Sequence, residues 1–138
     1  MFLVSCSGQR PSSLGVSDSG LAPCPSSPNC VSSDARDSTH KISPFQLDVS
    51  PTKAWRVARK LVSELPRTRI VNETSDYLHA ECRSALLGFV DDLELHLRPS
   101  EGVIAIRSAA RLGYSDFGVN RRRIEVLRAS LVSQGMVR

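Results

Sequence analysis

At 138 residues with a hydrophobic fraction of 41%, the chain is long enough to bury one modest core and too short for a second domain. No apolar run reaches the roughly 20 residues that a membrane-spanning helix needs, so the sequence predicts no transmembrane helix. The formal net charge is +4, and the excess lies in residues 98–138, which hold eight arginines against three acidic residues. This basic third favours an anionic partner or, more simply, a solvated basic surface.

The first 20 residues are interpreted as a flexible tether or as the remnant of a lipoprotein signal. Leu3-Val4-Ser5-Cys6 resembles a bacterial lipobox, in which Cys6 would carry the lipid. A complete signal also has a basic region and an apolar stretch of roughly 7–15 residues. No Lys or Arg precedes Cys6, which leaves two interpretations: the start lies further upstream, or Cys6 is an ordinary thiol at a frayed end.

Residues 7–50 are rich in proline and serine, a composition that disfavours regular helix and sheet. From about Leu21 onward, scattered apolar residues such as Ile42 and Phe45 predict that this segment lies along a domain surface. We therefore expect residues 21–138 to form a single domain.

Two amphipathic helices and four strands follow. The first helix is predicted at 51–64, because Ser50 can accept the first free amides and Pro51 needs no amide partner. Beyond Pro66 the apolar period changes to two, which indicates strands, and a helical period returns at the end of the chain. The expected strands are 68–73, 76–84, 87–98 and 103–108, and the expected last helix is 118–133. The short turns favour an α+β fold, an antiparallel four-stranded meander with both helices packed on one face.

Four motifs in a fixed order resemble one family of bacterial and plant-plastid proteins. They are APCPSSPNCVSS at 22–33, GFVDDLE at 88–94, RSA at 107–109 and GYSDFGVNR at 113–121. Over about residues 21–132 the chain is similar to the family called domain of unknown function 1499. What the resemblance implies is limited, because that family has no established activity to carry over.

The cysteines indicate a disulfide. Cys24 and Cys30 are separated by a chain that prolines stiffen, so a small disulfide-closed loop is expected if the compartment is oxidising. The alternatives are a reduced pair used for redox exchange or metal binding, and two unpaired structural thiols. Cys82 is expected to be a buried small hydrophobe. The spacing matches no familiar zinc pattern, so we expect neither a metal nor a cofactor.

The arginine-rich stretch between the last strand and the last helix is the best candidate for a site. Arg107, Arg111 and Arg121 would converge there, with Ser115 and Asn120 as further polar groups and free amides adding positive potential. Such an assembly would bind a phosphate, a carboxylate or an acidic lipid head group. The competing interpretation is a set of solvated arginines.

Two aspartates lie close to this stretch. Strict alternation turns Asp91 toward the core, where it needs either a bulge near Gly88 that exposes it or an ion pair with Arg107. Asp116 would cap the last helix. An enzyme that uses Asp91 or Asp116 as its acid or base in the same pocket is the alternative function.

A binding domain is favoured over an enzyme. The chain has no nucleophile elbow, Walker loop or metalloprotease helix, and His79 and His96 fall on polar strand faces, where histidines are usually exposed. Nucleic acid is disfavoured because no aromatic residues interleave the arginines. We expect a cell-envelope domain on the periplasmic side, held to the membrane only by a lipid on Cys6, that binds an anionic small molecule or partner. If the start codon is correct and no signal exists, a cytoplasmic location is expected instead.

Overall fold

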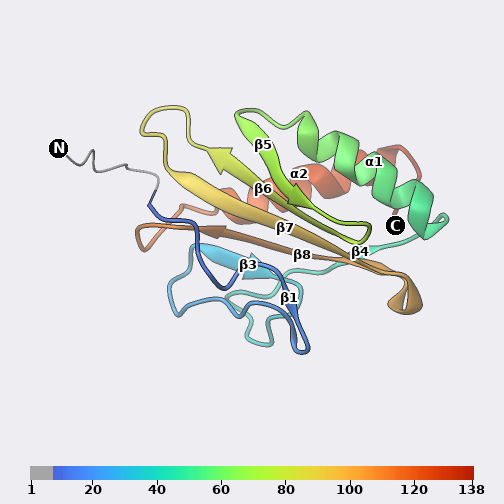
Figure 1. The fold of residues 1–138 in the computed structure, drawn as a ribbon, viewed down its shortest axis with the longest axis horizontal. Coiled ribbons are helices and arrows are strands. Elements are labelled where there is room, and N and C mark those ends of the chain that lie inside the picture. Colours follow the sequence, from blue (N-terminus) through green and yellow to red (C-terminus); the bar gives the residue numbers. More distant parts are fainter. Residues whose placement is uncertain (1–7) are drawn as a thin grey trace.

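The computed structural model describes residues 8–138 (Figure 1). Four short strands come first: β1 (Val16–Ser17), β2 (Gly20–Leu21), β3 (Cys30–Ser32) and β4 (Phe45–Gln46). Helix α1 (Pro51–Ser63) follows, and then the strands β5 (Thr68–Glu73), β6 (Tyr77–Arg83), β7 (Val90–Arg98) and β8 (Val103–Ala110). A 3-10 turn, η1 (Pro99–Glu101), joins β7 to β8, and helix α2 (Val119–Ser133) follows β8.

Six of the strands form one antiparallel sheet in the order β3-β8-β7-β6-β5, with β4 also paired to β8. Strands β1 and β2 form a separate two-stranded ribbon. The α+β class is confirmed, but the prediction of a four-stranded meander is wrong because it omits β3 and β4. Each of these strands is only two or three residues long and lies in the proline-rich and serine-rich segment, so no alternating pattern reveals it.

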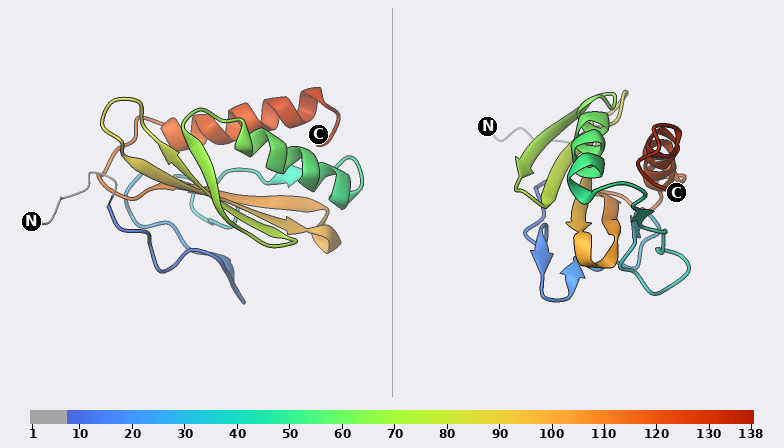
Figure 2. Two further views of the ribbon diagram at one scale, coloured as in Figure 1. Left: turned by 45° about the horizontal axis from the view of Figure 1, so that its top comes forward. Right: turned by 90° about the vertical axis from the view of Figure 1, so that its right-hand side faces the viewer.

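Both helices cover the same face of the sheet (Figure 2). Helix α1 begins as expected, because Oγ of Ser50 accepts the amide of Lys53 at 3.3 Å and Pro51 occupies the first turn. The helices pack their apolar stripes on alternate residues of the central strands, such as Leu93 and Ile106. The apolar residues that they bury are Ala54, Ala58 and Val62 of α1 and Ile124, Leu127 and Leu131 of α2.

The opposite face of the sheet is polar, and the N-terminal segment covers it (Figure 2). Arg10 donates two hydrogen bonds to Glu81, at 2.7 and 2.9 Å. The amide of Gly15 donates to Glu94 at 2.8 Å. Residues 8–20, assigned from the sequence to a tether, therefore contribute contacts to the folded domain.

Two sequence expectations concern the membrane: the lack of a membrane-spanning helix and a lipid on Cys6. Within residues 8–138, no helix is both long enough and apolar enough to cross a bilayer. The predicted lipid site, Cys6, lies outside the described residues.

A disulfide joins Cys24 to Cys30, as predicted. Cys30 is fully buried and pairs with Ala109 of β8, so the bridge fastens its loop to the edge of the sheet. Cys82 is free and buried on the helix-covered face, which confirms its expected role as a small apolar residue.

Loss of this disulfide should lower the free energy of unfolding by about 2 kcal/mol, because the bridge closes only a short loop. The measurement is urea denaturation of the oxidised wild type and of a C24A/C30A variant. Dithiothreitol should lower the free energy of unfolding of the wild type by a similar amount. A C82A control keeps the disulfide, so dithiothreitol should lower its stability by the same amount. Equal stability of the oxidised wild type and C24A/C30A would contradict the prediction.

Candidate functional site

The three arginines expected to converge lie in different environments. Arg107 is buried, and its Nε donates to the carbonyl oxygen of Ala22 at 2.9 Å. Arg111 donates from Nε to Asp92 at 2.8 Å. Arg121 donates from Nη1 to the carbonyl oxygen of Lys41 at 3.1 Å.

The structure therefore does not bring these guanidinium groups together. Arg107 and Arg111 are four residues apart along the direction of β8, so both point to the polar face of the sheet. Arg121 belongs to α2, which covers the other face. The residues around the strand-to-helix junction are close in sequence, but the sheet lies between Arg121 and the other two arginines.

The other two residues of the expected anion site, Ser115 and Asn120, also lie in different environments. Asn120 is fully buried, where it accepts a hydrogen bond from Oγ of Ser108 at 2.6 Å. Ser115 is exposed, and its Oγ accepts the amide of Phe117 at 3.3 Å. Asn120 thus holds the start of α2 against β8, while Ser115 shapes the turn before it.

Asp91 faces the helices, as the alternation predicted, but neither expected solution applies. Its carboxylate accepts a hydrogen bond from Nη2 of Arg123 at 2.8 Å. Arg123 also donates from Nη1 to Asn120, at 2.7 Å, so one guanidinium joins β7 to α2. The pairing with Arg107 was wrong because Arg107 points to the other face of the sheet.

Asp116 holds the first turn of α2, as expected. It accepts the amides of Gly118 and Asn120 at 2.8 and 3.0 Å. Burial raises the pKa of the Asp116 carboxyl, but the hydrogen bonds from Asn120 and Gly118 outweigh burial and hold the pKa below its usual range. A carboxylate of this kind is a weak proton acceptor, and it already supplies the negative charge that the helix start favours.

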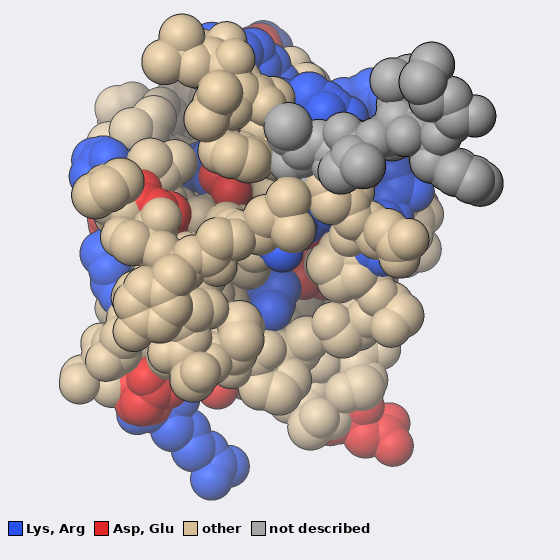
Figure 3. Space-filling view, turned by 90° about the vertical axis from the view of Figure 1, so that its left-hand side faces the viewer, with Lys and Arg blue, Asp and Glu red and all other residues tan. Residues whose placement is uncertain are grey.

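A hollow of about 290 Å³ lies between the β6–β7 loop (residues 84–89) and the β8–α2 loop (residues 111–118). We call it the loop hollow. Figure 3 looks onto this end of the molecule, where residues other than Lys, Arg, Asp and Glu form most of the surface. The loop hollow is lined by Ser84, Phe89, Asp91, Ala110, Leu112, Gly113, Ser115, Asp116, Phe117 and Val119. It therefore joins both aspartates of the enzyme hypothesis to a mainly apolar wall.

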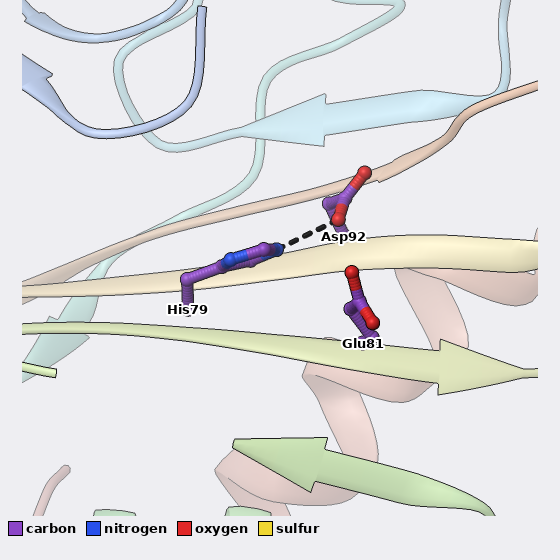
Figure 4. A group of neighbouring side chains, drawn as sticks. All are labelled: His79, Glu81 and Asp92. Atoms are coloured by element: carbon purple, nitrogen blue, oxygen red, sulfur yellow. Dashed lines mark hydrogen bonds and ion pairs between the residues drawn. The ribbon is translucent and has the colours of Figure 1, made fainter. Parts of the chain in front are cut away.

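A second cluster lies on the polar face and was missed from the sequence. Nε2 of His79 donates to Oδ1 of Asp92 at 2.7 Å, and Glu81 lies beside them (Figure 4). His79 is only 3% exposed, so the expectation that it is exposed was wrong. Alternation along β6 and β7 correctly places these side chains on one face, but it does not reveal that the N-terminal segment covers that face.

Arg111 binds both carboxylates of this cluster. Its Nη2 contacts Glu81 and also donates to Asp92 at 2.7 Å. His79, Glu81 and Asp92 offer ligand atoms within 4.8 Å of one another, a spacing that would suit a metal ion. Guanidinium groups of Arg111 and Arg10 already supply the positive charge there, so the cluster fits an ion-pair network better than a metal centre.

The network shifts the pKa values of its members. Burial raises the pKa of the Glu81 carboxyl, but hydrogen bonds from Arg111 and Arg10 outweigh burial and hold that pKa below its ordinary value. The pKa of Asp92 is likewise lowered, because hydrogen bonds from Arg111 and His79 exceed the effect of burial. Burial, together with a hydrogen bond to Glu94, raises the pKa of Tyr77 far above its usual range.

The model of a family described as "Protein of unknown function (DUF1499)" matches residues 20–131. The chain belongs to this family. Neither the curated proteins nor the solved structures contain a match. The region shared with DUF1499 includes the loop hollow and the acidic partners of Arg111, whereas Arg10 lies before it.

Replacing Arg111 by methionine should lower the free energy of unfolding of this DUF1499 domain by about 3 kcal/mol, because Glu81 and Asp92 then lack their shared cation. Urea denaturation at neutral pH measures the change. R59M is the matched control: it removes an exposed ion pair with Glu73 and should have little effect. Similar losses for R111M and R59M would contradict the role assigned to Arg111.

The stability of the DUF1499 domain should fall in acid. Because the pKa values of Asp92 and Glu81 are lowered on folding, their contribution is complete above the ordinary values of 3.8 and 4.5 and is lost as the pH falls below them. Thermal unfolding between about pH 6 and about pH 3 should show this loss. As the pH falls, the difference in unfolding temperature between the wild type and R111M should become smaller. A difference in unfolding temperature that stays constant with pH would refute the role of Arg111.

Proposed function

We propose that this DUF1499 domain binds a small apolar or amphipathic molecule in the loop hollow, and that it does so in the cell envelope. The observation that carries the proposal is the lining of the hollow, which is dominated by Phe89, Leu112, Phe117 and Val119. Ligand sites of proteins are typically concave and apolar, with a few polar groups that fix the ligand's orientation.

The turn before α2 positions Phe117, which forms part of the wall of the loop hollow. Phe117 is 86% exposed and has a φ of 54°, in the left-handed region that residues other than glycine seldom adopt. Oγ of Ser115 and the carboxylate of Asp116 fix this turn through hydrogen bonds to the amides of Phe117 and Gly118. A strained, well-supported residue of this kind is typical of a ligand-binding loop.

The charges in the hollow favour a neutral or cationic ligand over an anion. Its ionisable lining residues are Asp91 and Asp116, and both are carboxylates. Arg123 occupies Oδ2 of Asp91, whereas Oδ1 has no partner among residues 8–138. A hydroxyl or amino group of the ligand could therefore donate to Asp91 while its apolar part lies against Phe117.

The same contacts favour binding over catalysis. Asp116 is engaged by backbone amides, and Ser115 supports the turn, so neither is paired with a partner that would activate it. An acid or base role for Asp91 would first require release of Arg123.

A location in the cell envelope is supported by the disulfide between Cys24 and Cys30, since such bonds persist mainly in oxidising compartments. We propose that the domain lies on the periplasmic side and that a lipid on Cys6 attaches it to the membrane. The anionic ligands considered from the sequence lose their main support, because Arg107 and Arg111 are engaged with protein oxygens.

Titration with N-phenyl-1-naphthylamine, a neutral apolar dye, tests the binding proposal. The wild type should enhance its fluorescence, and F117A should bind it at least tenfold more weakly, because most of an aromatic contact is lost. V132A, which shortens an exposed side chain in the last turns of α2, is the control and should bind as the wild type does.

Competition against the bound dye tests the expected ligand class. Dodecylamine should displace the dye at lower concentration than dodecanoate, because Asp91 and Asp116 attract the first and repel the second. No dye binding by the wild type, or equal affinity of F117A, would refute the proposal. Stronger displacement by dodecanoate would return support to an anionic ligand.

A further inference from the structure

Large apolar side chains gather on the two loops that border the loop hollow. Leu86 is 94% exposed and protrudes from the β6–β7 loop, together with Leu87. Tyr114 is 70% exposed on the β8–α2 loop. We define the apolar tip as Leu86, Leu87, Phe89, Leu112, Tyr114 and Phe117, all of which are exposed. An exposed apolar cluster of this kind usually marks an interaction surface.

The loop carrying the leucines is braced rather than loose. The amide of Ser84 donates to the carbonyl oxygen of Phe89 at 2.9 Å, and the amide of Phe89 donates to Oγ of Ser84 at 3.0 Å. The amide of Arg111 donates to the carbonyl oxygen of Val90 at 3.1 Å, so the second loop begins beside the first. The two loops therefore lie at the same end of the sheet (Figure 1), and both carry exposed apolar side chains.

Arginines lie beside both loops of the apolar tip. Arg67, Arg69 and Arg83 line a hollow that also includes Ser84, Ala85 and Gly88 of the β6–β7 loop. Arg122 donates to the carbonyl oxygen of Phe117 at 2.8 Å, at the base of the other loop. All four arginines are exposed, and within residues 8–138 none is paired with a carboxylate. Figure 3 shows Lys and Arg atoms at the margin and near the middle of this end, together with smaller patches of Asp and Glu.

We infer that the apolar tip docks on an anionic lipid bilayer. Leucine, phenylalanine and tyrosine side chains on protruding loops suit insertion among lipid head groups, and the surrounding guanidinium groups suit contact with lipid phosphates. Within residues 8–138 these arginines have no carboxylate partner, so their positive charge beside an apolar cluster matches such a surface. The docking requires no ligand in the loop hollow, because Leu86, Leu87 and the three arginines beside them lie outside its lining.

The path of the chain is consistent with this orientation. The backbone of Gly8 lies against Leu112, and a methyl group on its Cα would come within 3.1 Å of that side chain. Cys6 precedes Gly8 by two residues in the sequence. A lipid on Cys6 would hold the apolar tip at the bilayer and bring the mouth of the loop hollow close to the source of apolar molecules.

Co-sedimentation with lipid vesicles tests the inference, using the full chain without a lipid on Cys6. The wild type should pellet with vesicles that contain phosphatidylglycerol and far less with pure phosphatidylcholine, and added salt should weaken the binding. The L86S/L87S and R67Q/R69Q/R83Q variants should each lose at least tenfold in vesicle affinity.

Matched controls separate this surface from general effects. V16S/V132S removes two exposed apolar side chains elsewhere, and R36Q/K53Q/R56Q removes three exposed charges elsewhere. Both should bind vesicles as the wild type does, and circular dichroism should confirm that every variant folds. L86S/L87S should retain the dye binding of the loop hollow, so the docking and the ligand proposals can fail separately.

A tryptophan at the tip provides a second readout. In a W55F/L87W variant, phosphatidylglycerol vesicles should shift the emission to shorter wavelength as residue 87 enters the apolar layer. The inference is overturned if the wild type does not bind these vesicles, if the tip variants bind as tightly as the controls, or if the emission does not shift on binding.

Discussion

Arg111 is the side chain on which the polar half of this structure depends. It joins Glu81 of β6 to Asp92 of β7 from the end of β8, so three neighbouring strands share one guanidinium. Without it, two carboxylates would be buried close together at a high electrostatic cost. Because the network satisfies its own charges, the N-terminal segment can lie on this face and the sheet can be covered on both sides.

Because both faces of the sheet are covered, the proposed binding surfaces lie at one end of the sheet. One face is occupied by the helices and the other by residues 8–34 and their hydrogen bonds, including that from Arg98 to Asp34. The loops at residues 84–89 and 111–118 extend beyond both layers. They can present apolar side chains to a ligand or a lipid surface without disturbing the core that positions them.

The sequence predicted what local pattern controls. Both helices and the strands β5 to β8 were found within a few residues, because apolar spacing and the Ser50-Pro51 start specify them. Pairing over long separations was not accessible, because β3 and β4 are very short strands that pair with β8 far along the chain. The burial of the His79 cluster could not be predicted for the same reason. Alternation along the strand shows which face His79 occupies, but not that the N-terminal segment covers that face.

The N-terminal segment contributes some of its contacts across very long stretches of chain. Arg10 meets Glu81 across 71 positions, and Arg107 meets the carbonyl oxygen of Ala22 across 85. During synthesis this segment emerges well before its partners on β6 and β8. The contacts that close the polar face therefore cannot form until β6 and β8 have been synthesised, and each of them closes a long loop of chain.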